Sequence, residues 1–189
     1  MPHTVTHSYV RGFGFTLIEL IITLGIALIL LITVIPSFRT LTVKNLQASE
    51  INSFVHHCHL ARSLSISRET HHILCPSSNG ESCTNVADWS DGYILYEDLN
   101  RNRSRDQNEL LQGVHQPIQG MSIGIDSSRH RRYVVYRGDG RPSGYNLTLT
   151  FCDPDNLIPP KAVIVSNLGR VRVSKTRSDG SQLSCSGEI

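Results

Sequence analysis

The sequence predicts an α+β fold in which one long N-terminal helix packs on antiparallel β-sheet. Two observations predict it. An apolar run over residues 15–36 leads into a segment, up to about residue 67, whose apolar residues recur every three or four positions. After Ser67 the pattern changes to short β-leaning runs separated by Gly, Pro, Asn and Asp. A helix followed by many short strands is the order of an α+β fold.

The apolar run is long enough to cross a bilayer as a helix, and it contains a single charge, Glu19. It is too long for the core of a secretory signal. Arg11 precedes it, with no acidic residue in residues 1–14, so the positive-inside rule keeps the N-terminus in the cytoplasm. We therefore expect a single-pass protein of the inner membrane, with the chain from about residue 40 onward in the periplasm.

Glu19 is unusual, because a carboxylate inside a membrane costs about 2.5–3.5 kcal/mol on insertion scales unless it finds a partner. One reading is that it lies close enough to the helix end to reach the headgroups. The other reading comes from residues 14–19, Gly-Phe-Thr-Leu-Ile-Glu, which resemble the class III signal of type IV prepilins and pseudopilins. This resemblance implies that prepilin peptidase cleaves between Gly14 and Phe15 and that Phe15 is N-methylated. Glu19 then pairs with the amino terminus of Phe15 in a neighbouring subunit.

The chain is thus expected to have three parts: a leader peptide of residues 1–14, a transmembrane and assembly helix of residues 15–38, and a globular periplasmic domain of residues 39–189. In the last part the helix carries an apolar stripe made by Ile51, Phe54, Val55, Cys58, Ala61 and Leu64. The expected strands are residues 71–75, 92–97, 110–116, 121–125, 132–137, 145–152, 161–167 and 170–176.

Four of the five cysteines are expected to form disulfides, since an exported chain meets an oxidising compartment. Four cysteines allow three connectivities, and the sequence does not decide among them. We favour pairing of neighbours, Cys75 with Cys83 and Cys152 with Cys185. Cys58 lies on the apolar stripe, where we expect it to pack as a small hydrophobe.

Two segments suggest metal binding without requiring it. Residues 56–59, His-His-Cys-His, lack four convergent ligands at helical spacing, so we expect a solvated helix face and no metal. Residues 98–109 place oxygen-bearing side chains at positions 1, 3, 5, 7, 9 and 12 of the calcium-loop template. Arg103 replaces the template's glycine and three arginines add positive charge, so we favour a polar hairpin loop and keep calcium as the alternative.

Charge is concentrated near the C-terminus, although the whole chain carries a net charge of only +2. The cations are Lys161, Arg170, Arg172, Lys175 and Arg177, and the window that they span has no acidic residue. Arg170 and Arg172 share one face of an alternating strand, about 7 Å apart, a spacing suited to neighbouring phosphates. Gly169 suits a tight turn before them. The alternative is an ordinary exposed strand whose arginine stems cover apolar surface.

The sequence contains none of the common catalytic or nucleotide-binding motifs. It has no G-x-S-x-G elbow, no H-E-x-x-H, no Walker loop and no dinucleotide fingerprint. We therefore expect no enzyme and no cofactor.

Several internal segments resemble the FimT/GspH family of minor pilins and pseudopilins. They are residues 89–98, Trp-Ser-Asp-Gly-Tyr-Ile-Leu-Tyr-Glu-Asp, with their Asn-rich continuation to residue 111, then residues 136–140 and residues 163–172. The resemblance implies a pilin-like fold and partnership with other pilins or pseudopilins. In FimT-type members a G-R-x-R motif is implicated in DNA binding during natural transformation, and Gly169-Arg170-Val171-Arg172 matches it.

Two functions are expected. The first is a minor pilin of a type IV pilus that binds the DNA backbone non-specifically during DNA uptake. The resemblance implies Gly169, Arg170 and Arg172 as the binding residues, and charge alone adds Lys161, Lys175 and Arg177. The second is a structural pseudopilin at the tip of a type II secretion machine, which contacts its partner subunits and no nucleic acid.

Overall fold

A computed structural model describes residues 14–116, 119–127, 132–144 and 146–185 of the chain. The predicted leader therefore lies outside the described residues except for Gly14. The chain divides into two compact units between Arg39 and Thr40, and each is described separately below. Helix α1, Leu17–Arg68, contributes to both units.

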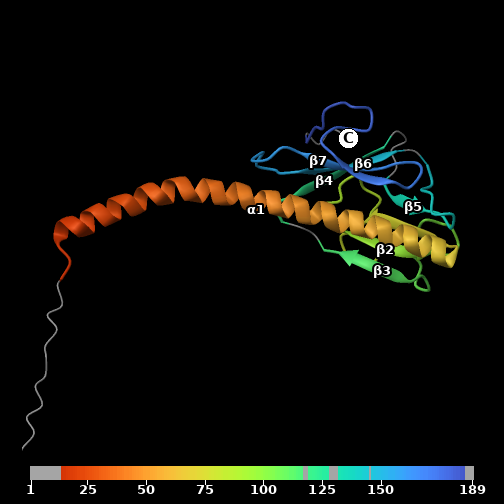
Figure 1. The fold of residues 1–189 in the computed structure, drawn as a ribbon. Coiled ribbons are helices and arrows are strands. Elements are labelled where there is room, and N and C mark those ends of the chain that lie inside the picture. The colour runs from red at the N-terminus through yellow and green to blue at the C-terminus, as the bar shows by residue number, and fades with distance from the viewer. Residues whose placement is uncertain (1–13, 117–118, 128–131, 145, 186–189) are drawn as a thin grey trace, which may run out of the picture. The chain divides into compact units, whose positions relative to one another are not determined.

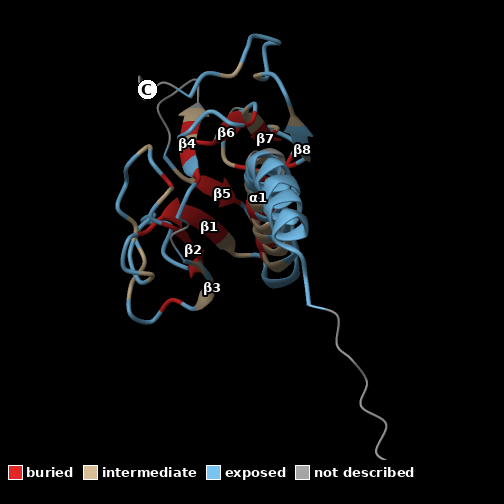
Figure 2. Ribbon diagram, turned by 90° about the vertical axis from the view of Figure 1, so that its left-hand side faces the viewer, coloured by how far each residue is buried: buried red, intermediate tan, exposed pale blue. Residues whose placement is uncertain are grey.

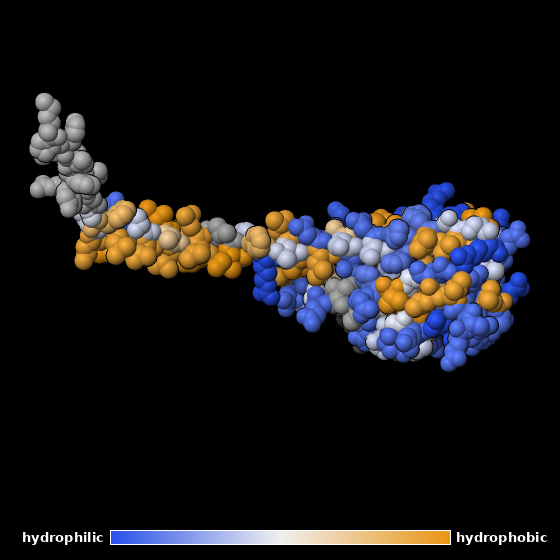
Figure 3. All heavy atoms as spheres, turned by 90° about the horizontal axis from the view of Figure 1, so that it is seen from below, coloured by the Kyte–Doolittle hydropathy of each residue, from blue (hydrophilic) through white to orange (hydrophobic). Residues whose placement is uncertain are grey.

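In the first unit, α1 begins after Thr16, whose side-chain oxygen accepts a hydrogen bond from the backbone N–H of Glu19 (3.3 Å). This is the geometry of an N-cap, which satisfies one of the free donors at a helix start. The apolar side chains that follow are exposed, and Figure 3 shows them covering this segment. Among the described residues, α1 is the one helix long and apolar enough to cross a membrane.

In the second unit, α1 buries one stripe against the sheets. Ile51, Phe54, Cys58 and Ala61 are almost completely buried, at the three- and four-residue spacing that the sequence predicts. Gln47 extends this stripe, because its side-chain amide donates to the backbone oxygens of Phe151 (3.2 Å) and Pro159 (3.1 Å). The helix is thereby fixed to the sheet by polar as well as apolar contacts.

The strands form two four-stranded sheets in which every pairing is antiparallel (Figure 1). Sheet A has the order β3-β2-β1-β5 and sheet B the order β4-β6-β7-β8. The strands are β1 His71–Pro76, β2 Tyr93–Asp98, β3 Leu111–His115, β4 Ser122–Ser127, β5 Val134–Tyr136, β6 Leu147–Cys152, β7 Lys161–Val165 and β8 Val171–Ser174.

The main core joins α1 to both sheets. Phe54 of the helix packs edge-on against Trp89 and Tyr93, with ring centroids 5.8 and 5.6 Å apart, and tilts onto Phe151 of sheet B. Sheet A has a second apolar cluster, formed by Ile73, Cys75, Ile94, Tyr96 and Val135. Strands β1, β2, β5, β6 and β7 are buried along most of their length, whereas β3 and β8 contain no buried residue (Figure 2).

The predicted elements agree with the structure: each of the eight predicted strands is present, and the fold is α+β with a long helix on antiparallel sheet. Strand ends differ by up to two residues. The division into two sheets is a feature that the sequence analysis did not anticipate.

The structure pairs Cys75 with Cys83 and Cys152 with Cys185, the neighbour connectivity that the sequence favoured. Cys58 is a free cysteine and is completely buried in the main core. Burial raises the pKa of its thiol to about 12, because the thiolate would be desolvated there.

Candidate functional site

The Gly169-Arg170-Val171-Arg172 segment forms the turn between β7 and β8 and the start of β8. The backbone N–H of Ser166 donates to the oxygen of Arg170, and the N–H of Gly169 donates to the oxygen of Ser166, both at 2.9 Å. Gly169 has a φ of +80°, in the left-handed region that favours glycine. The glycine of the motif is therefore required by the shape of the turn.

This turn lies against other parts of the second unit. A Cβ atom at Gly169 would come within 2.9 Å of the backbone oxygen of Gly140 and 3.3 Å of the Arg62 guanidinium. Arg62, from α1, donates a hydrogen bond to the backbone oxygen of Gly169 (3.0 Å). Arg62 could not be predicted as a partner of this turn from the sequence, because nothing in the spacing of residues 62 and 169 links them.

Arg170 and Arg172 are both exposed, and their side chains form no hydrogen bond or ion pair with any described residue. Val171, between them, packs against the main core. Because side chains alternate along a strand, Arg172 lies on the face of sheet B opposite to Val171. Two guanidinium groups are thus available to an anionic ligand at a fixed turn.

The other predicted cations do not gather around this pair. The register Ala162↔Ser174 places Lys161 and Lys175 at the far end of the β7–β8 hairpin, about 13 Å along the strand from the turn. Arg177 forms an ion pair with Asp126 of β4 (2.9 Å) and also donates to Ser184. Arg177 therefore has an anionic partner of its own, which fixes the C-terminal segment to sheet B.

The N-terminal site contains Gly14, Phe15 and Glu19, and all three are exposed. Glu19 is in the first turn of α1, two residues after the helix begins at Leu17. Its carboxylate forms no hydrogen bond or ion pair with the described part of the chain. The predicted partner of Glu19, the amino terminus of Phe15, belongs to a neighbouring subunit.

The histidines of α1 behave differently from one another. His56 and His59 are exposed, as predicted, but the expectation of a solvated face is wrong for His57. His57 Nδ1 lies 3.0 Å from the hydroxyl of Tyr93, and burial lowers the pKa of the ring. His57 is therefore part of the contact between α1 and sheet A.

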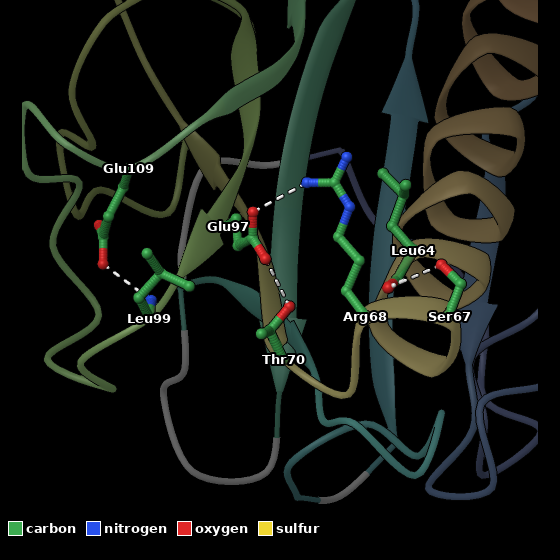
Figure 4. Close-up of polar contacts among 7 residues, drawn as sticks. All are labelled: Leu64, Ser67, Arg68, Thr70, Glu97, Leu99 and Glu109. Atoms are coloured by element: carbon green, nitrogen blue, oxygen red, sulfur yellow. Dashed lines mark hydrogen bonds and ion pairs between the residues drawn. The ribbon is translucent and has the colours of Figure 1, made fainter.

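A partly buried ion pair joins the end of α1 to sheet A. Arg68 donates to Glu97 of β2 (2.9 Å), and the hydroxyl of Thr70 donates to the other carboxylate oxygen (2.7 Å; Figure 4). Burial alone would raise the pKa of Glu97, but these two hydrogen bonds and the charge of Arg68 outweigh it and lower the pKa.

The loop after β2 closes on itself through carboxylates. Glu109 is buried and accepts hydrogen bonds from the backbone N–H groups of Leu99 (2.9 Å; Figure 4) and Asp106 (3.0 Å). Asp98 is also buried and accepts from the N–H of Arg103 (3.2 Å). The loop is thus an ordered structure and more than the polar hairpin that the sequence predicts.

Comparisons with known proteins give a family and a fold. The family model described as "Type II transport protein GspH" matches residues 50–169. No curated protein matches the chain. Two crystal structures of the type IV minor pilin FimU of Pseudomonas aeruginosa are 14% and 15% identical to the chain. Both have a TM-score of 0.51, and each match covers 75% of this chain. The matches cover 98% and 93% of the respective FimU chains.

The minor pseudopilin EpsH from the type 2 secretion system of Vibrio cholerae is 11% identical, with a TM-score of 0.47, covering 67% of this chain and 94% of its own. At these identities the FimU structures show a shared fold alone. The family rests on the model match, which spans sheet A and three strands of sheet B and ends at Gly169, before β8.

Proposed function

Because this chain belongs to the GspH family of pilin and pseudopilin subunits, we propose that it is a minor pilin of a type IV pilus that binds DNA through the turn between β7 and β8. Subunits of this kind are structural, and their task is to assemble and to present a surface. The surface proposed here consists of Arg170 and Arg172, positioned by Gly169. Lys161 and Lys175 extend it along the hairpin.

The observation that carries the proposal is the pair of exposed guanidinium groups without a partner among the described residues. Arginine binds phosphate through two parallel hydrogen bonds, and contacts of this kind to the backbone carry no base information. The binding should therefore be indifferent to sequence and should weaken as salt rises. Arg177 contributes little, because its guanidinium is already paired with Asp126.

The N-terminal part of the proposal concerns assembly. Prepilin peptidase removes residues 1–14, Phe15 is N-methylated, and Glu19 of the helix pairs with the new amino terminus of a neighbouring subunit. Residues 15–38 hold the protein in the inner membrane before assembly, and residues 39–189 lie in the periplasm. The carboxylate of Glu19 is exposed and has no ion pair with any described residue, which supports this arrangement, since two charges that meet only in the filament favour polymerisation.

The test measures DNA affinity of a fragment of residues 40–189, the compact unit that contains both sheets. Changing Arg170→Gln together with Arg172→Gln should weaken binding at least tenfold and lower the slope of log affinity against log salt by about 2. The control, Arg103→Gln with Arg105→Gln, removes the same charge from the loop after β2. If the Arg170 and Arg172 variant binds DNA as tightly as the wild type, the proposed surface is wrong.

The second candidate is a pseudopilin of a type II secretion system without DNA binding, and the description of the matching family favours it. A fragment with no DNA affinity at low salt, whose native partners are secretion subunits, would indicate this function. The genes beside its own distinguish the two most cheaply, since they encode either other minor pilins or secretion components.

A further inference from the structure

The turn between β7 and β8 has a counterpart in residues 137–141, which follow β5. In these residues the N–H of Arg137 donates to the oxygen of Arg141 (3.0 Å), and the N–H of Gly140 donates to the oxygen of Arg137 (2.7 Å). The β7–β8 turn has the same hydrogen-bond pattern, and in both turns a glycine with positive φ is followed directly by an arginine. Arg141 thus has the place in its turn that Arg170 has in the other.

The two turns lie against each other. A Cβ atom at Gly169 would lie 2.9 Å from the backbone oxygen of Gly140, so the turns meet at their glycines. Because consecutive Cα atoms are about 3.8 Å apart, this contact places the Cα atoms of Arg141 and Arg170 within about 12 Å of each other. Two arginines that are far apart in the sequence are therefore neighbours on the surface.

Helix α1 holds both turns in this position. A Cβ atom at Gly140 would lie 2.6 Å from Cδ1 of Ile66, so this turn packs directly on the helix. Arg62 donates to the backbone oxygen of Gly169 (3.0 Å), and its Nε would lie 3.6 Å from the same Cβ position at Gly140. Arg62 therefore contacts both turns and is a positioning residue for them.

Positive charge gathers where the two turns meet. Arg141 is exposed, and its side chain forms no ion pair with any described residue. Arg137 is paired with Asp139, but the pair is 3.7 Å long and its side chains are 46% and 51% exposed, so it contributes little. With Arg170 and Arg172, the two turns and the start of β8 carry four arginines and a single acidic residue.

This arrangement fits a DNA duplex. The two strands of a duplex place their phosphates on both sides of a minor groove about 6 Å wide, whereas a single strand has one row of phosphates. Arg170 and Arg172 form one row of cations, and Arg137 and Arg141 form a second row beside it. Surfaces that bind single strands usually stack the bases on aromatic side chains, and neither turn contains an aromatic residue.

We propose that Arg137 and Arg141 form the second half of the DNA-binding surface, so that the two turns hold a duplex through phosphates of both strands. This inference rests on the proposed function of the β7–β8 turn. Arginine donates two parallel hydrogen bonds to a phosphate, and such contacts carry no base information. Asp139 lies within this surface, and its negative charge opposes the binding of DNA.

The test titrates the full chain, in non-ionic detergent, into a short labelled duplex of mixed sequence and follows fluorescence anisotropy at several salt concentrations. Arg137→Gln together with Arg141→Gln should weaken duplex binding at least tenfold and lower the slope of log affinity against log salt by about 2. For one strand of the same duplex the loss should be about threefold or less. Arg103→Gln with Arg105→Gln removes the same charge elsewhere and is the control.

Asp139→Asn changes the charge of the surface in the opposite direction. Its side-chain oxygen accepts the N–H of Arg141 (3.0 Å), and an asparagine oxygen accepts the same bond, so the turn is kept. Removal of the negative charge should raise duplex affinity about two- to fivefold. This variant keeps the test informative even if the double arginine variant alters the turn.

A loss of duplex affinity in the Arg137 and Arg141 variant, with a gain in Asp139→Asn, supports the inference. If the former binds the duplex as the wild type does, while Arg170→Gln with Arg172→Gln does not, this inference is wrong and the proposed function stands. An equal loss for the duplex and the single strand would also overturn it, since no second strand is then contacted. If the wild-type chain binds no DNA at low salt, both the proposed function and this inference are wrong.

Discussion

At the scale of single residues, Gly169 shows how a sequence motif and a close contact require the same residue. Its φ of +80° disfavours any side chain, and a Cβ atom would lie 2.9 Å from the oxygen of Gly140. Gly169→Ala should therefore lower the free energy of unfolding by about 2–4 kcal/mol, combining backbone strain with a steric clash. Urea denaturation measures this difference.

Gly180 is the matched control for this prediction. It has a similar φ, +88°, but open space around the position of a Cβ atom. Gly180→Ala should cost only the strain, about 1–2 kcal/mol. Equal losses in the two variants would show that the contact with Gly140 has no energetic effect.

The residue scale also marks the limit of what the sequence predicts. The turn at Gly169 and the exposure of Arg170 and Arg172 could be expected from glycine chemistry and strand alternation. The partners Arg62 for Gly169 and Asp126 for Arg177 could not, because each pair is brought together only when distant elements pack. The net charge of residues 161–177 therefore overestimates the number of cations available to a ligand, because Arg177 is paired with Asp126.

At the scale of elements, the Arg68–Glu97 pair joins the end of α1 to β2. Arg68→Gln should lower the free energy of unfolding at pH 7 by about 1–2 kcal/mol, less than a fully buried pair because the Arg68 side chain is 39% exposed. Arg137→Gln, which breaks an exposed pair with Asp139 at 3.7 Å, should cost about 0.5 kcal/mol or less.

The sign of the pH dependence follows from the lowered pKa of Glu97. Below the ordinary glutamate pKa of 4.5, the unfolded state binds a proton that the folded state still lacks. The contribution of the pair is thus complete above about pH 4.5 and is lost as the pH falls through the folded pKa. The difference between wild type and Arg68→Gln should shrink on acidification, and a constant difference would contradict this assignment.

The eight strands could be placed from the sequence because Gly, Pro, Asn and Asp punctuate them, and the stripe of α1 because its period is 3.6 residues. The sequence could not predict which strands belong to which sheet, because strand pairing depends on contacts between residues far apart in the chain. β1 pairs with β5 across more than 50 intervening residues. The same limit explains why the loop after β2 was expected to be a simple hairpin: burial of Asp98 and Glu109 depends on what packs around them.

At the scale of the whole molecule, the second unit is held together by a core shared between α1 and two sheets, and two disulfides add covalent links. Cys75–Cys83 closes a short loop beside β1, whereas Cys152–Cys185 ties the last described residue to the end of β6. Arg177 and Asp126 join the same C-terminal segment to sheet B at a second point. The segment of residues 175–185 is thus a fixed part of the fold.

The two disulfides should contribute unequally to stability. The chain-entropy model gives about 3.7 kcal/mol for Cys152–Cys185, whose cysteines are 33 residues apart, and about 2.5 kcal/mol for Cys75–Cys83, which are 8 apart. We therefore expect the Cys152→Ser and Cys185→Ser double variant to lose more unfolding free energy than the Cys75→Ser and Cys83→Ser pair. Denaturant titration of both oxidised variants tests the order. The opposite order would mean that burial of Cys75 in the second apolar cluster outweighs the constraint on the unfolded chain.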